Sequence, residues 1–234
     1  MACSVSSHNT FAGPALEHPL PHAESRFACV TNMQKHDIPN VKEVLGIWMR
    51  YVTEMMAKHP SPDAIDPKTG ISDLGISTNY LGVYMALKCS VEAIEKDPYT
   101  KIKVLLAKDE EGQIQSALSY NTQNREIFSI LELLSAPWNL RFSAPSMNIS
   151  HPLRGGGLML IDALCKTASR EGTEEVSVVS QEIARPFYAK IGMRESCYAF
   201  FTFELKNDED QGKIKAAMER AFGKNFHYSL LTET

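Results

Sequence analysis

The sequence predicts an α/β (α+β) fold, in which helices cover both faces of a mixed, mostly antiparallel central sheet. Three strand-like segments, residues 101–109, 113–121 and 127–135, follow one another, with Gly112 supplying the turn between the first two. Amphipathic helical patterns lie before and after these strands. From residue 127 onward strands alternate with helices, and such crossover connections join parallel strands. Together these patterns predict the mixed sheet.

The N-terminal half is expected to hold one strand and two helices. Residues 26–33 alternate as a strand, and a helix over 41–59 follows with Asn40 as its N-cap. Turn-forming Pro, Gly and Asp residues then predict a long loop over 60–77. A second helix is expected over 79–97, capped by Ser77 or Thr78.

The C-terminal half is expected to complete the sheet and its helical layers. Residues 127–135 are nearly continuously apolar, as in a central strand covered on both faces. An irregular stretch over 140–153 comes next. The remaining predicted elements are a helix over 158–172, a strand over 174–180, a helix over 181–192, a strand over 196–205 and a helix over 208–223. We therefore divide the chain into a poorly ordered tail (1–25), one domain (26–206) and a helical extension (207–234).

Composition argues against several classes of protein. The 234 residues are 44% hydrophobic and 22% charged, which is typical of a globular domain. A net charge of -4 without a dense Lys/Arg block argues against a nucleic-acid partner. No apolar stretch approaches the roughly 20 residues that cross a bilayer, and the N-terminus lacks the pattern of a secretory signal. The five scattered cysteines predict neither disulfides nor a zinc site. We expect a cytoplasmic protein without a membrane or metal partner, with an organelle transit or export signal in the tail over 1–25 as the alternative; its oligomeric state stays open.

A glycine-rich segment lies between the apolar strand and the next predicted helix. Arg154-Gly155-Gly156-Gly157 leads directly into Leu158 and Met159. Unpaired N–H groups at a helix start bind phosphate, and glycines let a ligand approach the backbone closely. The segment lacks the Gly-Lys-Ser/Thr ending of a Walker loop and the spacing of a Rossmann fingerprint. It therefore predicts another kind of phosphate site, with a purely structural turn as the alternative.

A second segment, residues 184–193, carries Tyr188 near its centre. Taken alone, this tyrosine is explained as a half-buried aromatic residue whose hydroxyl group finds a backbone partner. The functional alternative is a general acid, because a phenol within hydrogen-bond reach can protonate a departing thiolate.

Together, in this order and spacing, the two segments resemble the GNAT superfamily of acyl-CoA-dependent N-acyltransferases. Residues 154–159 are similar to its phosphate-binding pattern Arg/Gln-x-x-Gly-x-Gly/Ala, with Met159 in place of the last small residue. Residues 184–193 are similar to its Ala-x-x-Phe-Tyr-x-Lys-x-Gly-Phe block, with Met193 at the end. The resemblance covers about 104–205. It implies a GNAT-like sheet whose fourth strand splays from the fifth, with CoA in the resulting V.

The resemblance also implies a reaction and its residues. An acetyl or longer acyl group would pass directly from acetyl-CoA to a primary amine in a ternary complex, without a metal. An N–H near Leu134 would polarise the thioester carbonyl, and Tyr188 would protonate the CoA thiolate. The implied donor contacts are the backbone groups of Leu133, Leu134 and Ser135, the charge of Arg154 and the N–H groups of Gly155, Gly156, Gly157, Leu158 and Met159. The identity of the amine acceptor is not specified.

A general base for the amine calls for a carboxylate or histidine whose pKa is raised by burial. Glu132, within the apolar strand, is the first candidate, and its alternative is an outward or cross-strand-paired glutamate. Glu126 and His151 are further candidates. Three aspartates fall in a loop that borders the acceptor side in this family and could attract an amine: Asp63, Asp66 and Asp73.

Two other functions stay open. The chain could be a non-catalytic acyl-CoA-binding regulatory module of the same fold. It could also be a nucleotide-binding α/β protein that uses the glycine segment for the phosphates of ATP or NAD.

Overall fold

The computed structural model describes residues 26–58, 72–97, 99–140, 152–197 and 199–231 of the chain. Its strands are β1 (Phe27–Asn32), β2 (Ile102–Asp109), β3 (Ile114–Asn121), β4 (Ile127–Ser135), β5 (Glu175–Val179), β6 (Arg194–Cys197), β7 (Phe200–Glu204) and β8 (Ser229–Leu231). Its α-helices are α1 (Ile38–Lys58), α2 (Asp73–Lys96), α3 (Gly156–Arg170), α4 (Arg185–Ile191) and α5 (Asp208–Phe222).

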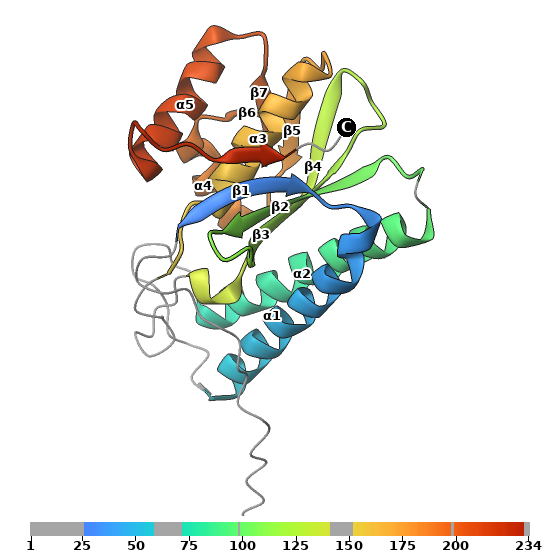
Figure 1. The fold of residues 1–234 in the computed structure, drawn as a ribbon. Helices are drawn as coiled ribbons and strands as arrows, with labels where there is room; N and C mark the ends of the chain where they lie inside the picture. The colour runs from blue at the N-terminus through green and yellow to red at the C-terminus, as the bar shows by residue number, and fades with distance from the viewer. Residues whose placement is uncertain (1–25, 59–71, 98, 141–151, 198, 232–234) are drawn as a thin grey trace, which may run out of the picture.

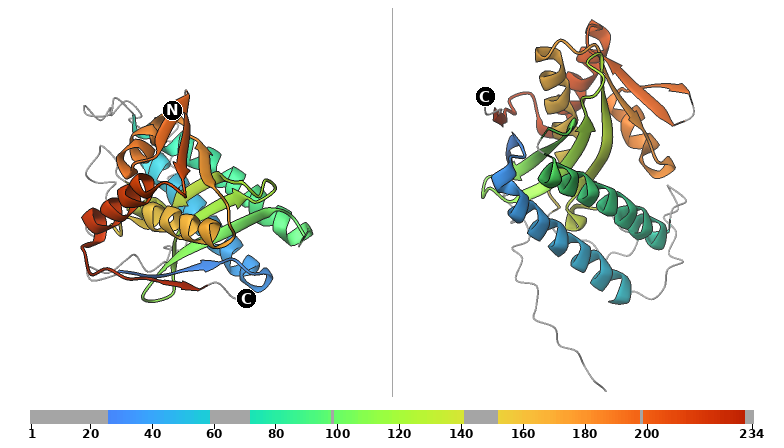
Figure 2. Two further views of the ribbon diagram at one scale, coloured as in Figure 1. Left: turned by 90° about the horizontal axis from the view of Figure 1, so that it is seen from above. Right: turned by 90° about the vertical axis from the view of Figure 1, so that its right-hand side faces the viewer.

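These strands form one sheet in the order β6-β7-β5-β4-β3-β2-β1-β8 (Figure 1). Neighbouring strands are antiparallel except for β4 with β5 and β1 with β8, which are parallel. Helices α1 and α2 lie side by side on one face, whereas α3, α4 and α5 lie on the other (Figure 2). The predicted fold class is therefore confirmed. None of the described helices is long and apolar enough to cross a membrane.

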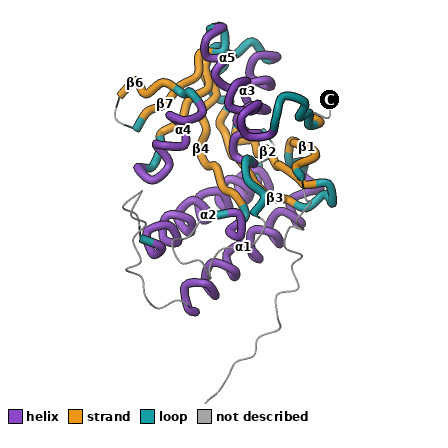
Figure 3. The backbone as a smooth tube through the Cα atoms, turned by 90° about the vertical axis from the view of Figure 1, so that its left-hand side faces the viewer, coloured by secondary structure: helices purple, strands orange, loops and turns teal. Residues whose placement is uncertain are grey.

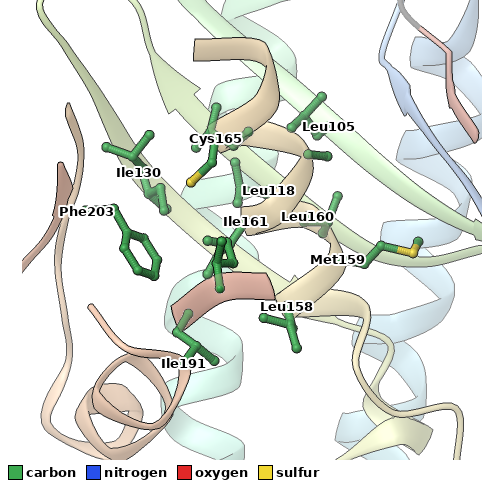
Figure 4. Packing of buried hydrophobic residues seen from close by; sticks show 14 of the residues in the cluster. Leu105, Leu118, Ile130, Leu158, Met159, Leu160, Ile161, Cys165, Ile191 and Phe203 are labelled. Atoms are coloured by element: carbon green, nitrogen blue, oxygen red, sulfur yellow. The ribbon is translucent and has the colours of Figure 1, made fainter. Parts of the chain in front are cut away.

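Each face of the sheet has its own apolar core. On one face Val41, Leu45 and Trp48 of α1 pack with residues of α2 and with Leu134. On the other face α3 buries nearly all of its side chains, including Met159 and Leu160, against the sheet (Figure 4). Each large apolar side chain buried in this way contributes about 1.5–3 kcal/mol. Packing on both faces is therefore what holds the central strands in place.

Helices α1 and α2 both begin earlier than predicted. Helix α1 begins at Ile38, with Pro39 in its first turn, where the fixed φ of proline suits a helix. Asn40 therefore lies inside the helix and is not its N-cap. Helix α2 is capped by Ser72, whose Oγ accepts a hydrogen bond from the N–H of Gly75 at 3.0 Å. The predicted caps of this helix, five and six residues further on, are interior positions.

The prediction of a single strand over 196–205 is also wrong. The chain forms a hairpin of two strands, β6 and β7, with Ala199 between them at φ 63. Because β6 is exposed along its whole length, its Arg194-Glu195-Ser196-Cys197 sequence lacks the apolar alternation that would have marked it as a strand.

The C-terminal extension packs on the rest of the fold. The side chain of Asn207 caps α5 by accepting from the N–H groups of Glu209 and Asp210. The chain then adds β8 to the edge of β1, an element that the sequence did not predict. Just before β8, Tyr228 donates a hydrogen bond to Oδ2 of Asp162 on α3 at 2.6 Å. The extension therefore contains a strand as well as the predicted helix.

The first residues of α3 are packed so closely that larger side chains would not fit. A Cβ atom on Gly155, which has φ 101, would lie 2.4 Å from Cζ of Phe222 at the end of α5. A Cβ atom on Gly156 would lie 2.2 Å from Oγ of Ser116 and 2.7 Å from Cζ of Phe27. The two glycines therefore allow the N-terminus of α3 to approach β3, β1 and α5.

We predict that Gly156→Ala destabilises the protein by about 1–3 kcal/mol, because the methyl group must displace buried atoms of two strands. The matched control is Gly82→Ala in α2, where a Cβ atom meets nothing within 4 Å. That change should stabilise the protein by about 0.5–1 kcal/mol, since alanine favours a helix. Urea unfolding of both variants measures the difference; equal effects would contradict the close packing of α3.

Candidate active site

The sheet opens between the parallel strands β4 and β5. Pairing runs from Ile127 opposite Glu175 to Ile130 opposite Val178, and β5 ends one residue later. Strand β4 continues to Ser135 and pairs there with β3 alone. Figure 3 shows β4 running on toward α2, with α4 to one side of it. The result is the splayed pair of strands that the resemblance implies.

A β-bulge starts this opening. In the β3–β4 ladder Ser119 lies opposite Glu132 and Tyr120 opposite Ile130, so Leu131 is the extra residue of β4. A bulge bends its strand and increases the local twist, which turns β4 away from β5. Leu131 is 38% exposed and Val179, at the end of β5, is 74% exposed. Apolar side chains thus border the opening on both strands.

Among the described residues, Leu133 and Ser135 are the ones whose backbone groups point away from β3 at the end of β4. The N–H of Ala136 donates to the carbonyl of Gln115 on β3 at 2.8 Å. Backbone groups of an antiparallel strand alternate in direction, so the N–H and C=O of Leu134 also point to β3. Those of Leu133 and Ser135 point the other way. Of the three β4 residues predicted to contact the donor, Leu133 and Ser135 therefore direct their backbone groups away from β3, whereas Leu134 directs its own toward β3.

The N-terminus of α3 lies at the open end of β4. A Cβ atom on Gly157 would be 3.3 Å from the side chain of Leu133 and 3.5 Å from Phe187 of α4. The N–H of Met159 already donates to the carbonyl of Gly155 at 3.0 Å. The amides of this first turn without a helical partner are therefore those of residues 155–158, which leaves four donors and the positive helix end at the opening.

Two other predicted phosphate-site residues differ in their exposure. Arg154 is exposed beside the first turn, where its charge is available to an anion. Met159 is fully buried in the core beneath α3 and is labelled in Figure 4. Its side chain is therefore an apolar packing element and does not occupy the space in front of the amides.

Glu132 lies on the side of the sheet that carries α2. It is opposite Ser119, whose buried hydroxyl accepts a hydrogen bond from Ser90 of α2 at 3.4 Å, and cross-strand partners share a face. In a regular strand Glu132 would lie on the same face as Ile130, which packs in the core on the α3 side of the sheet. The bulge places it on the other face. The side chain is half-buried, and this burial raises the pKa of its carboxyl group to about 7. The group is therefore partly ionised at neutral pH.

Tyr188 lies on α4 with only 5% of its surface exposed. Its ring centroid is 5.1 Å from that of Phe187 and 5.8 Å from that of Phe201. Burial, and second the negative charge of Glu132, raise the pKa of the Tyr188 phenol well above its usual value. Glu132 and Tyr188 come from different elements, β4 and α4, which lie on the two sides of the opening. With its pKa raised, the Tyr188 phenol keeps its proton at neutral pH.

Among the other predicted site residues, Glu126 lies away from this opening. Glu126 is exposed immediately before β4, where its carbonyl accepts from the N–H groups of Glu174 and Glu175. That is the paired end of β4 and β5. Asp73 is the first residue of α2, whereas three candidates lie outside the described residues: Asp63, Asp66 and His151. The described residues contain no group of three or more His, Cys, Asp or Glu side chains placed to hold a metal ion.

Sequence reasoning missed two features of the site. The bulge at Leu131 has no local signal, because the run 130–134 is apolar on both sides of Glu132 and fits either register. The close approach of Phe222 to Gly155 joins the helix of the C-terminal extension to the glycine segment, which lies far from it in the chain. A conspicuous glycine segment is the only hint that the backbone there must approach something closely.

No protein-family model matches the chain, and no curated protein sequence matches it either. Solved structures do show similarity. A GNAT-family N-acetyltransferase from Escherichia coli in complex with CoA aligns with a TM-score of 0.44 and 13% identity over 93% of each chain. The spermidine/spermine N-acetyltransferase of Vibrio cholerae aligns with a TM-score of 0.44 and 7% identity, over 82% of this chain and 99% of that one.

An aminoglycoside 6'-acetyltransferase of type Ii aligns with a TM-score of 0.43 and 9% identity, over 76% of this chain and 97% of that one. Likenesses this distant concern the course of the backbone and transfer no activity. The chain's own strand order, its parallel β4–β5 pair and the opening between them agree with the GNAT-like sheet that the sequence predicts.

Proposed function

We propose that the protein is an acyl-CoA-dependent N-acyltransferase that moves an acetyl group from acetyl-CoA to a primary amine. The observation that carries this proposal is the opening between β4 and β5, which has the unpaired amides of α3 at its mouth. An elongated ligand with a phosphate group at one end and an amide-rich arm suits such a site. CoA has both parts.

The donor would bind mainly through backbone groups. The amides of residues 155–158 and the positive end of α3 would hold the diphosphate, with Arg154 adding a charge. The amides of the pantetheine arm would pair with the edge groups of Leu133 and Ser135, as a further strand pairs with a sheet edge. The exposed apolar side chains of Leu131 and Val179 would contact its methylene groups.

The chemistry would be a direct transfer in a ternary complex. Glu132 accepts a proton from the ammonium group of the acceptor, directly or through water, and the free amine attacks the thioester carbonyl. The N–H of Leu133 or Ser135 stabilises the oxyanion. The C–N bond forms, the C–S bond breaks and Tyr188 gives its proton to the departing thiolate. The second proton that the nitrogen loses on becoming an amide passes through water and restores the Tyr188 phenol. The acceptor is a primary amine whose identity we leave open.

The first test is thermal unfolding with acetyl-CoA, CoA, ATP or NAD at equal concentration. A ligand that binds only the folded state stabilises it by about 2.7 kcal/mol at one hundred times its Kd, which shifts Tm by roughly 5–10 °C. We expect such a shift with acetyl-CoA and CoA only. A shift with ATP or NAD alone would contradict the proposal and favour a nucleotide site. CoA binding without transfer to any amine would identify a regulatory module.

A second prediction concerns the stability contributed by Glu132. The folded protein holds the Glu132 proton up to about pH 7, whereas the unfolded chain loses it near 4.5, so this group lowers stability as pH rises between these values. Glu132→Gln removes that cost. The variant should be more stable than the unchanged protein by about 1 kcal/mol at pH 8, a value reduced because solvent screens the half-buried carboxylate. Near pH 4.5 the two proteins should be equally stable.

Urea unfolding across this pH range measures the difference. The control is Glu126→Gln immediately before the same strand, at an exposed position, whose curve should stay parallel to that of the unchanged protein. In kinetics, kcat/KM of the unchanged enzyme should rise with pH through a limb near 7 that Glu132→Gln lacks. A limb that survives in this variant would assign the base to another group.

A third prediction concerns the general acid. Tyr188→Phe keeps the ring packed between Phe187 and Phe201 but removes the acidic proton. We expect kcat to fall about 10²–10⁴-fold with little change in the Kd of acetyl-CoA. Steady-state kinetics on a panel of primary amines, with binding measured by calorimetry, separates the two quantities. Unchanged kcat would rule out Tyr188 as the proton donor.

A further inference from the structure

A fully buried glutamine connects the start of β3 to the chain that follows β4. Gln115 has none of its surface exposed. Its Oε1 accepts hydrogen bonds from Nε1 of Trp138 at 3.0 Å and from Nδ2 of Asn139 at 3.1 Å. Its Nε2 donates to Oδ2 of Asp109 at 2.9 Å. All three partners lie outside β3. Because both the oxygen and the nitrogen of the Gln115 amide are hydrogen-bonded, the orientation of this amide is determined.

Asp109 in turn is held by the hairpin between β2 and β3. Its Oδ1 accepts from the N–H groups of Glu111 at 3.1 Å and Gln113 at 2.9 Å, and its side chain is buried. A buried amide whose oxygen and nitrogen both have partners is costly to replace, because any apolar side chain would leave those partners unpaired. The arrangement therefore anchors Trp138 and Asn139 to a rigid hairpin.

Asn139 also binds the backbone next to the glycine segment. Its Oδ1 accepts a hydrogen bond from the N–H of Leu153 at 2.7 Å, and Leu153 immediately precedes Arg154. The side-chain amide of Asn139 thus holds two segments that are 14 residues apart in the chain. Through it, the backbone that enters the first turn of α3 is tied to the end of β4.

The neighbouring residue on β3 supports the same turn from the opposite face. The hydroxyl group of Ser116 donates to the carbonyl of Gln115 at 2.7 Å and lies 3.0 Å from Oγ of Ser135. The same hydroxyl limits the space at Gly156. Ser116 therefore lies between the end of β4 and the start of α3, and its neighbour Gln115 is linked to Leu153 through Asn139.

We infer that Gln115 and Asn139 are positioning residues that hold the phosphate-binding turn of α3 in register with the free edge of β4. The inference rests on the proposed function, because the register matters only for a ligand that contacts both parts. Neither side chain needs to touch that ligand. Gln115 acts through Asn139, and Asn139 acts through the backbone of Leu153.

The test compares Asn139→Ala with Trp138→Phe. Each removes one donor to the same Oε1 atom of Gln115, but only Asn139→Ala also removes the acceptor for the N–H of Leu153. We expect Asn139→Ala to raise the Kd of CoA, measured by calorimetry, roughly threefold to tenfold. Trp138→Phe should change this Kd less than twofold, even if urea unfolding shows that it is the less stable variant.

Hydrogen exchange reports directly on the hydrogen bond between Leu153 and Asn139. The Leu153 amide should exchange faster in Asn139→Ala and at an unchanged rate in Trp138→Phe. Equal changes of Kd in the two variants, or a Kd that follows their loss of stability, would overturn the inference while leaving the proposed function intact. Failure of the unchanged protein to bind CoA would overturn the proposed function, and this inference with it.

Discussion

The short pairing between β4 and β5 is the constraint on which the proposed site depends. The two strands share only the stretch from Ile127 to Ile130 before the bulge at Leu131 turns β4 away. Beyond that point the described residues pair β4 with β3 alone, so the backbone groups on the other edge of β4 need a partner. A ligand with its own amide groups can be that partner. A break in the sheet thereby becomes a candidate binding surface.

The glycine segment serves two physical purposes at this opening. A side chain at Gly155 would clash with Phe222, and one at Gly156 would clash with Phe27 and Ser116. Packing within the protein therefore requires glycine at both positions. The amides of the same turn have no helical partner and are available to an anion. The absence of side chains therefore allows α3 to approach the sheet while its positive end stays at the mouth of the opening.

Burial gives the two candidate catalytic groups complementary protonation states. Desolvation raises the pKa of Glu132 to about 7, so this carboxylate can accept a proton at neutral pH. Desolvation together with the charge of Glu132 raises the pKa of Tyr188, so the phenol remains a proton donor. In both groups burial in apolar surroundings is the main cause of the raised pKa.

The sequence by itself determined the fold class, the order of the main elements and the glycine segment at a helix start, because periodicity and glycine chemistry are local. Only the tertiary structure decided which edge groups of β4 are free, since the bulge at Leu131 depends on pairing with β3. The strand β8 and the links from Gln115 to Leu153 likewise join residues far apart in the chain. Contacts of this kind leave no pattern in the sequence, and packing alone selects them.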